Sequence, residues 1–203
     1  MQISYHPNPE RQSILTISCD GSPWRDIHTA VFGRRPLLPQ GCGSLEDFSE
    51  QFSDFEYRQA KNYAIRRLSL QGMLSTALSR AMKERLISEK TVNQLILELT
   101  ELGFLNDDEW AASFVRGQAG KKFGPRAIAQ KLMNKGVKGE KLELALEKSW
   151  GPIEQKGLII KLLKSRYSRR NLDDFKEKQK VIASLMRRGF DFFIISNCMK
   201  LNN

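Results

Sequence analysis

The sequence contains few of the residues from which most catalytic and metal sites are built. Its 203 residues include only two histidines, His6 and His28, and only three cysteines, at positions 19, 42 and 198. The histidines do not fall at a metal-ligand spacing, and no Ser-His-Asp or Cys-His set is evident. An odd number of distant cysteines indicates neither a disulfide framework nor a Cys-x-x-Cys metal site. We therefore expect no enzyme: no catalytic residue, no metal and no cofactor.

Long apolar runs are also missing. The longest ones, such as "GLII" and "DFFIIS", are far shorter than the ~20 residues with which a helix crosses a bilayer. The N-terminal "MQISYHPNPERQ" lacks the basic and apolar regions of a secretory signal peptide. Together with the cysteine pattern, these features predict a cytoplasmic protein with no membrane partner.

Charge is distributed unevenly along the chain, whose net charge is +10. Residues 1–53 hold 4 Lys or Arg and 6 Asp or Glu, residues 54–109 hold 8 and 9, and residues 110–203 hold 21 and 8. The last segment therefore carries a net charge of +13. A one-sided excess of this size favours a polyanionic partner over a merely solvated surface.

The first forty-three residues differ in pattern from the rest. Alternating apolar and polar residues around Asp20-Gly21 predict a β-hairpin, because Asp-Gly accepts the positive φ angles of a type I′ turn. Pro23, just after the turn, suits only an edge strand. A linker rich in proline and glycine covers residues 34–44, and the apolar period is helical from Ser44 onward.

The helical part contains a weak internal repeat. Its copies align through an apolar position and through a turn between two helices, at Met82, Leu132 and Leu185 and at Leu86, Gly136 and Gly189. A further helix precedes each pair, over residues 54–69, 107–117 and about 154–167. The sequence thus predicts a mainly α-helical chain, with a β-hairpin segment and linker (1–43) and three tandem three-helix modules (44–103, 104–150 and 151–203) in an elongated array.

Three consecutive acids, Asp107, Asp108 and Glu109, raise the question of a carboxylate site. Asn106 before them is a favourable N-cap, and acids in the first turn stabilise a helix through its dipole. A metal or catalytic site would need further ligands, and no histidine is near. Helix capping is therefore the favoured interpretation.

The stretch after these acids matches known motifs only in part. Trp110 and Phe114, four residues apart, are expected to face the core of the second module together. The loop "GQAGKK" has Val115 and Lys122 where a Walker phosphate loop needs glycine and Ser or Thr. Gly117 and Gly120 fit the bare Gly-x-x-Gly of a KH module, but the sheet of that fold is missing. Helices joined by a Lys-Gly turn are compatible with a helix-turn-helix, yet no helix carries base-reading residues at its N-terminal end.

A basic cluster lies at the centre of the second module, at the end of one helix, in the loop and along the polar side of the next helix. It consists of Arg116, Lys121, Lys122 and Arg126, with Lys131 and Lys135 continuing the same helix face. We expect these residues to bind a partner through phosphates or carboxylates. For any single one of them, simple solvation is an equal alternative.

The segments "GFLNDDEWAASFVR" and "KKFGPRAIAQKLMNKGV" resemble the central signature of the RecX family, bacterial regulators of the RecA recombinase. That signature has Gly-aromatic-Leu-Asp-Asp, an Ala/aromatic helix ending in Arg, a basic loop with Gly-Pro, and a Lys-Gly turn. "AKNYAIRRLS" (60–69) resembles the helix of the family's first module, and "SLMRRGFDFFII" (184–195) its third module. The chain departs from the family at Leu86, where glycine is usual, and over residues 34–53.

The resemblance implies a non-enzymatic protein, which we expect to be monomeric, that binds in the groove of the RecA filament on single-stranded DNA and can also touch DNA directly. It implies inhibition of strand exchange, ATPase and co-protease activity, and so a role in DNA repair and the SOS response. The alternative is a basic helical DNA-binding module that acts without RecA. A filament regulator needs the filament for high affinity, whereas a DNA binder does not.

Overall fold

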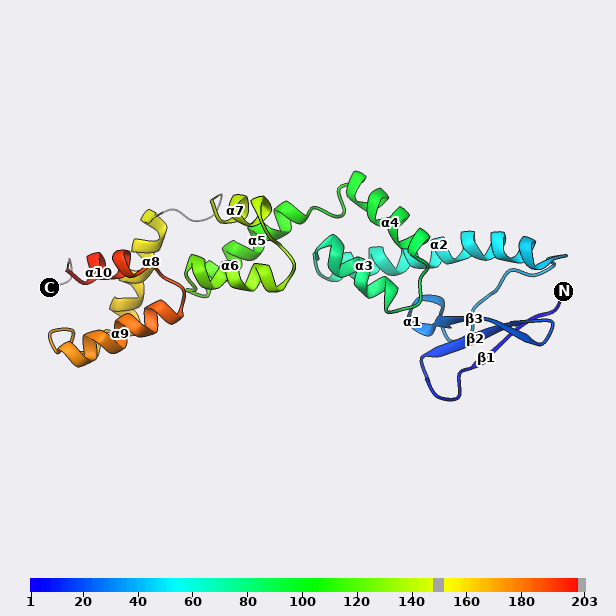
Figure 1. Ribbon diagram of the computed structural model, residues 1–203, viewed down its shortest axis with the longest axis horizontal. Helices are drawn as coiled ribbons and strands as arrows, with labels where there is room; N and C mark the ends of the chain where they lie inside the picture. The colour runs from blue at the N-terminus through cyan, green and yellow to red at the C-terminus, as the bar shows by residue number, and fades with distance from the viewer. Residues whose placement is uncertain (148–151, 201–203) are drawn as a thin grey trace. The chain divides into compact units, whose positions relative to one another are not determined.

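The computed structural model describes residues 1–147 and 152–200 (Figure 1). Helices form most of it, and a small antiparallel sheet lies at the N-terminus. This confirms the mainly α-helical class predicted from the sequence. The chain divides into two compact units, Met1–Asp107 and Asp108–Asn203.

The N-terminal sheet has three strands in the order β1-β2-β3, namely β1 Ile3–Pro7, β2 Ile14–Cys19 and β3 Ser22–His28. Between β2 and β3, Asp20 and Gly21 have φ angles of 47° and 79°, so the predicted turn with two positive φ angles is confirmed. Pro23 lies in β3, which is an edge strand as expected. The sequence pattern did not predict β1, because four of its five residues are exposed and give no alternating apolar signal.

Four helices complete the first unit: α1 Thr29–Phe32, α2 Leu45–Leu70, α3 Ser75–Lys83 and α4 Glu89–Glu101. The long helix α2 begins nine residues before the predicted residue 54. Its start is fixed by Ser44, whose hydroxyl accepts a hydrogen bond from the backbone N–H of Asp47 (3.1 Å). Phe48, Phe52 and Phe55 recur at helical spacing and form its buried stripe.

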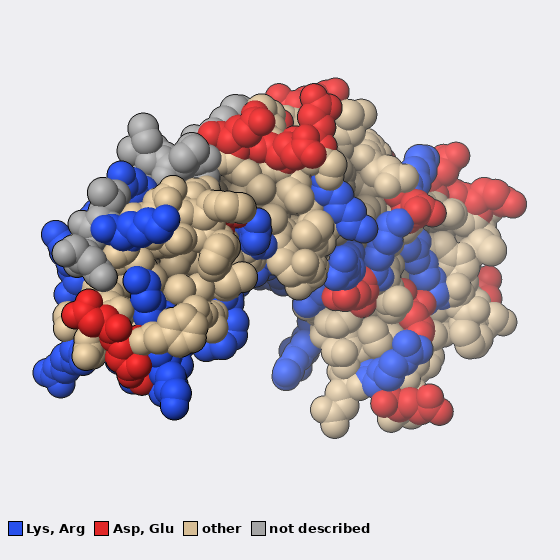
Figure 2. All heavy atoms as spheres, turned by 60° about the vertical axis from the view of Figure 1, so that its left-hand side comes forward, with Lys and Arg blue, Asp and Glu red and all other residues tan. Residues whose placement is uncertain are grey.

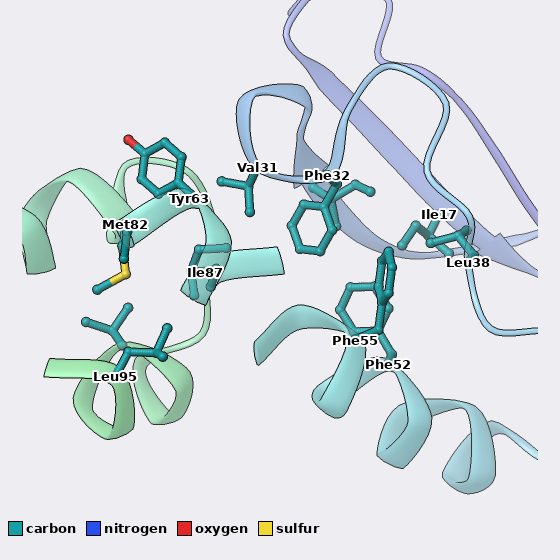
Figure 3. Packing of buried hydrophobic residues seen from close by; sticks show 14 of the residues in the cluster. Ile17, Val31, Phe32, Leu38, Phe52, Phe55, Tyr63, Met82, Ile87 and Leu95 are labelled. Atoms are coloured by element: carbon teal, nitrogen blue, oxygen red, sulfur yellow. The ribbon is translucent and has the colours of Figure 1, made fainter. Parts of the chain in front are cut away.

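The sheet and these helices share one hydrophobic core, seen in Figure 3. Trp24 of β3 packs edge-on against Phe48 and Phe52, with ring centroids 4.9 and 5.0 Å apart. Figure 3 shows Phe52 and Phe55 beside Ile17 and Phe32, and the core continues into α3 and α4. The three cysteines are free, as their spacing predicted.

Glu56 of α2 is a buried carboxylate, 1% exposed, that joins three parts of this unit. It pairs with the guanidinium of Arg25 from β3. It also accepts hydrogen bonds from the backbone N–H and the hydroxyl of Ser88 and from the hydroxyl of Thr91 (2.9 Å). Ser88 is itself the N-cap of α4. One ion therefore fixes the sheet, α2 and the start of α4 against each other.

All the regular secondary structure described in the second unit is helical. Its helices are α5 Asp107–Gly120, α6 Pro125–Asn134, α7 Glu140–Glu147, α8 Pro152–Ser165, α9 Phe175–Arg187 and α10 Phe192–Lys200. Helix α5 starts in the first unit with Asp107. As predicted, Pro125 is the first residue of α6 and its fixed φ suits that position.

The internal repeat is visible as the helix pairs α3/α4, α6/α7 and α9/α10. The aligned residues Met82, Leu132 and Leu185 all have no exposed surface. The turn positions all have positive φ, +62° at Leu86, +93° at Gly136 and +88° at Gly189. In each turn the next N–H bonds back to the carbonyl of the aligned apolar residue, which ends the helix in the same way three times. Leu86 holds this conformation at a cost of about 1–2 kcal/mol that glycine avoids.

Replacing Glu56 by alanine should lower the free energy of unfolding of the first unit by about 3–5 kcal/mol, because Arg25 loses its buried partner. Urea unfolding of a Trp110→Phe, Trp150→Phe background measures this, since Trp24 is then the only tryptophan. Glu50→Ala, an exposed change on the same helix, is the matched control and should stay within about 0.5 kcal/mol. Equal costs for the two variants would contradict the role of Glu56.

Candidate partner interface

The six basic residues of the candidate site lie along α5, the following loop and α6. Arg116 near the end of α5 forms an ion pair with Glu109 (2.7 Å), and the side chains are 57% and 65% exposed. Such an exposed pair contributes little stability, because water and salt screen it. Arg116 can therefore exchange Glu109 for an anion on a partner.

Lys131 is half-buried. Its ammonium lies 3.3 Å from the ring centroid of Phe123 and donates a hydrogen bond to the side-chain oxygen of Gln118 (2.7 Å). Partial burial, and then the nearby charge of Lys121, lower the pKa of Lys131 from its ordinary value. The structure thus brings Lys121 and Lys131 together, and Lys131 also supports the loop through Phe123.

Lys135 lies elsewhere, over the stacked rings of Trp110 and Phe114. Its ammonium is 5.8 and 5.6 Å from their ring centroids, and the two rings are 5.3 Å apart. The two rings stack on one face of α5, as their spacing predicted, and both are half-buried. The fully buried residues of α5 are smaller, namely Ala111, Ala112 and Val115. The rings therefore stay partly accessible beside Lys135, whose ammonium lies within the range of a cation–π contact.

Arg126 reaches the helices at the C-terminal end of the chain. Its guanidinium forms an ion pair with Asp191, in the turn before α10 (2.7 Å). The Arg126 side chain stays 67% exposed. The other carboxylate oxygen of Asp191 accepts the backbone N–H of Phe193 (2.8 Å). Asp191 therefore caps α10 and holds Arg126 at the same time.

This contact rests on an unusually close approach of two backbones, at Gly124 and Gly189. The N–H of Gly124 donates to the carbonyl of Arg188 (2.7 Å), and the N–H of Arg126 donates to the carbonyl of Gly189 (3.1 Å). A Cβ atom on Gly124 would lie 2.5 Å from the carbonyl carbon of Gly189, and one on Gly189 would lie 2.2 Å from the nitrogen of Ala127. Only glycine fits at either position. The C-terminal end of α9 is thereby bonded to the N-terminal end of α6.

The loop lysines flank this contact. Lys122 has a φ of +62°, and its carbonyl accepts a hydrogen bond from the guanidinium of Arg188 (3.3 Å). Lys121 is exposed. In the part of the chain that the structure describes, neither lysine forms an ion pair with an acid. Figure 2 shows lysine and arginine side chains spread over the forward, C-terminal part of the second unit.

The sequence interpretation did not assign Arg188, Asp191 or Phe193 to the interface. The repeat aligns Gly189 with Gly136, which marks the turn but not its contact with α6. The available signal was the pair of glycines at 124 and 189, together with the run "RRGFDFF". Of the six predicted residues, the structure places Lys122 and Arg126 at this contact and Lys121 beside it. Lys131 is near Lys121, whereas Arg116 on α5 and Lys135 at the end of α6 lie elsewhere.

The described residues contain neither a metal-binding group nor a membrane-spanning helix. Within 1–147 and 152–200 there is no group of three His, Cys, Asp or Glu side chains placed to hold a metal ion. No helix in the same residues is long and apolar enough to cross a membrane. What this surface offers a partner is positive charge and aromatic rings.

Among the three consecutive acids, Asp107 contacts a helix other than its own, which its position in the sequence did not indicate. The carboxylate of Asp107 accepts hydrogen bonds from the backbone N–H and the hydroxyl of Ser75 (2.7 and 2.6 Å). Ser75 is the first residue of α3, whose own N-cap, Leu74, has no side-chain acceptor. Asp107 therefore caps α3 from 32 residues away.

Asp107→Ala should lower the free energy of unfolding by about 1 kcal/mol, because the first N–H of α3 loses its acceptor. Asp107→Asn keeps an oxygen acceptor and should cost less. Asp108→Ala, an exposed change one residue away, should cost only a few tenths of a kcal/mol through the helix dipole. Urea unfolding compares the three variants, and equal losses for Asp107→Ala and Asp108→Ala would show that the dipole alone matters.

Gly189→Ala should open the contact between α9 and α6, whereas Gly136→Ala should not. Both substitutions put a side chain at positive φ, which costs about 1 kcal/mol, but only at Gly189 does the new Cβ meet backbone. We expect amide hydrogen exchange at Gly124 and Arg126 to accelerate at least about tenfold in Gly189→Ala alone. Equal exchange in the two variants would contradict the constraint.

Comparison with known proteins agrees with this architecture. Family models described as the second and third three-helix domains of RecX match residues 106–146 and 154–199. A regulatory protein RecX from Mycobacterium sp. (strain JLS) is 31% identical over 140 residues, covering 65% of this chain and 75% of the relative. One from Mycolicibacterium smegmatis is 29% identical over 167 residues, covering 77% and 87%.

Solved structures give the same result. The crystal structure of a regulatory protein RecX matches 96% of this chain and 98% of its own with a TM-score of 0.65 at 23% identity, which shows the shared fold. RecX from Lactobacillus salivarius matches 72% of this chain and 96% of its own, also with a TM-score of 0.65, at 25% identity. On these sequence and structural grounds, the chain belongs to the RecX family of regulatory proteins.

Proposed function

We propose that this chain is a negative regulator of RecA that binds the RecA filament on single-stranded DNA and inhibits its recombinase, ATPase and co-protease activities. The observation that carries the proposal is the match of residues 106–146 and 154–199 to RecX three-helix domains. In this proposal the chain is a cytoplasmic monomer without catalytic activity, and residues 44–103, 104–150 and 151–203 act as three binding modules.

The charge distribution supports this target. The two matched domains lie in the segment 110–203, where 21 Lys or Arg face 8 Asp or Glu. A nucleoprotein filament presents phosphates and carboxylates over a long surface, and a series of helical modules can contact many of them at once. Binding then inhibits RecA by occupying that surface, which requires no reaction centre.

A second candidate is a basic helical module that binds DNA without RecA. The net charge of +13 over residues 110–203 favours it, because phosphate contacts alone give appreciable non-specific affinity. The two functions differ in one measurable quantity. A filament regulator binds RecA-coated single-stranded DNA much more tightly than the same DNA without RecA, whereas a direct DNA binder does not.

The loop lysines provide the sharpest test of the candidate interface. Reversing Lys121 and Lys122 to Glu changes the charge by four units at the edge of the α6–α9 contact, and Arg126 is kept because a Glu there would face Asp191. We expect at least about tenfold weaker inhibition of RecA ATPase and strand exchange, and affinity for the filament should fall with rising salt. Circular dichroism and thermal unfolding should be unchanged.

Lys138→Glu, Lys141→Glu is the matched control, since both lysines are exposed in the same module and the change in charge is equal. It should inhibit nearly as well as the unchanged protein. If both double variants lose inhibition equally, net charge and not this loop determines binding. If the Lys121, Lys122 variant is folded and inhibits at the original concentrations, this part of the interface is excluded.

A further inference from the structure

Basic and aromatic side chains meet where α9 ends and α6 begins. We call this the junction surface, and it comprises Lys121, Lys122, Arg126, Arg187, Phe192 and Phe193. Three of these residues come from the second repeat and three from the third. The backbone bonds of Gly124 and Gly189 hold the two groups together.

The carboxylate of Asp191 connects the basic side of this surface to its aromatic side. One oxygen of Asp191 binds the guanidinium of Arg126 at 2.7 Å, and the other accepts the N–H of Phe193 at 2.8 Å. The charge of Arg126 therefore lies within a few ångströms of the backbone of Phe193. This spacing comes from the fold, because 65 residues separate Arg126 from Asp191.

The cations of the junction surface are accessible to an anion. Arg187 and Lys121 are exposed, and neither has an acidic partner in the described part of the chain. Arg126 is paired with Asp191, but its own side chain remains 67% exposed and can meet a second anion. Residues 151–203 hold 12 Lys or Arg and 5 Asp or Glu, so the surroundings are strongly positive.

The phenylalanines are exposed although their helix has a well-filled buried face. Phe193 is 76% exposed and Phe192 is 45% exposed, with ring centroids 6.0 Å apart. The buried face of α10 is taken by Ile195, Cys198 and Met199. Phe193 therefore contributes little to the core, and most of its ring is accessible to a ligand.

We propose that the junction surface binds an unpaired nucleic acid strand, with its lysines and arginines on the phosphates and Phe193 stacked on a base. Cations that follow a backbone and aromatic rings that stack on bases are the two features that single-strand binding requires. A duplex keeps its bases stacked on each other, so it cannot use Phe193. The inference rests on the proposed function in that it names the part of the filament, the DNA strand, that this surface contacts.

The experiment measures binding of the full chain to a fluorescent oligo(dT) strand by anisotropy, without RecA. Phe193→Ala should weaken binding at least about fivefold, as expected for the loss of one stacked base. Phe175→Ala is the matched control: Phe175 is 72% exposed but begins α9, about 20 Å along the helix from Arg187. It should leave the affinity unchanged, and a duplex of equal length should bind Phe193→Ala and the unchanged protein equally.

Two results would overturn the inference while leaving the proposed function intact. In the first, the unchanged protein binds RecA filaments, but the Phe193→Ala variant and the unchanged protein bind oligo(dT) with equal affinity. In the second, Phe193→Ala loses filament binding only, which makes the aromatic contact one with protein. Failure of the unchanged protein to bind filaments, together with Phe193-dependent binding of oligo(dT), would instead reject the proposed function and keep this inference.

Discussion

The close approach of Gly124 and Gly189 is the constraint on which the candidate interface depends. Two peptide backbones meet with no room for a Cβ atom on either side. The N–H groups that α6 leaves unpaired at its start are satisfied by the carbonyls that α9 leaves unpaired at its end. Because Lys122, Arg126, Arg188 and Asp191 all flank these bonds, the same contact that orders the helices also positions the charged surface.

In the first unit, a different interaction fixes the elements against each other. There a buried ion, Glu56, joins the sheet to two helices through Arg25, Ser88 and Thr91. The turn at Leu86 has the conformation of the glycine turns, and its carbonyl accepts a hydrogen bond from Arg25 (3.3 Å). A side chain does not fit at Gly189, where a Cβ atom would meet the backbone of Ala127, whereas the same turn conformation accepts a leucine at position 86.

Local chemistry explains which features could be predicted from the sequence. The Asp20-Gly21 turn, the proline at the start of α6 and the apolar period of the helices each depend on residues a few positions apart, and all were predicted. Strand β1, the capping of α3 by Asp107 and the partner of Arg126 depend on residues between 8 and 65 positions apart, and a single sequence carries little signal for such pairs. Trp110 and Phe114 stack on one face of α5 as their spacing predicted, but spacing alone does not indicate how deeply that face is buried.

The junction of α9 and α6 also determines the kind of electric field that an approaching anion meets. The C-terminal end of α9, which carries the negative end of its dipole, meets the N-terminal end of α6, which carries the positive end. The two dipole fields therefore largely cancel at this point. The attraction therefore comes from the ammonium and guanidinium groups alone, which move with their side chains. Its reach is set by the ionic atmosphere, about 10 Å at 0.1 M salt. A polyanion is thus drawn in from a distance that the solution controls, and it meets groups that can still adjust to it.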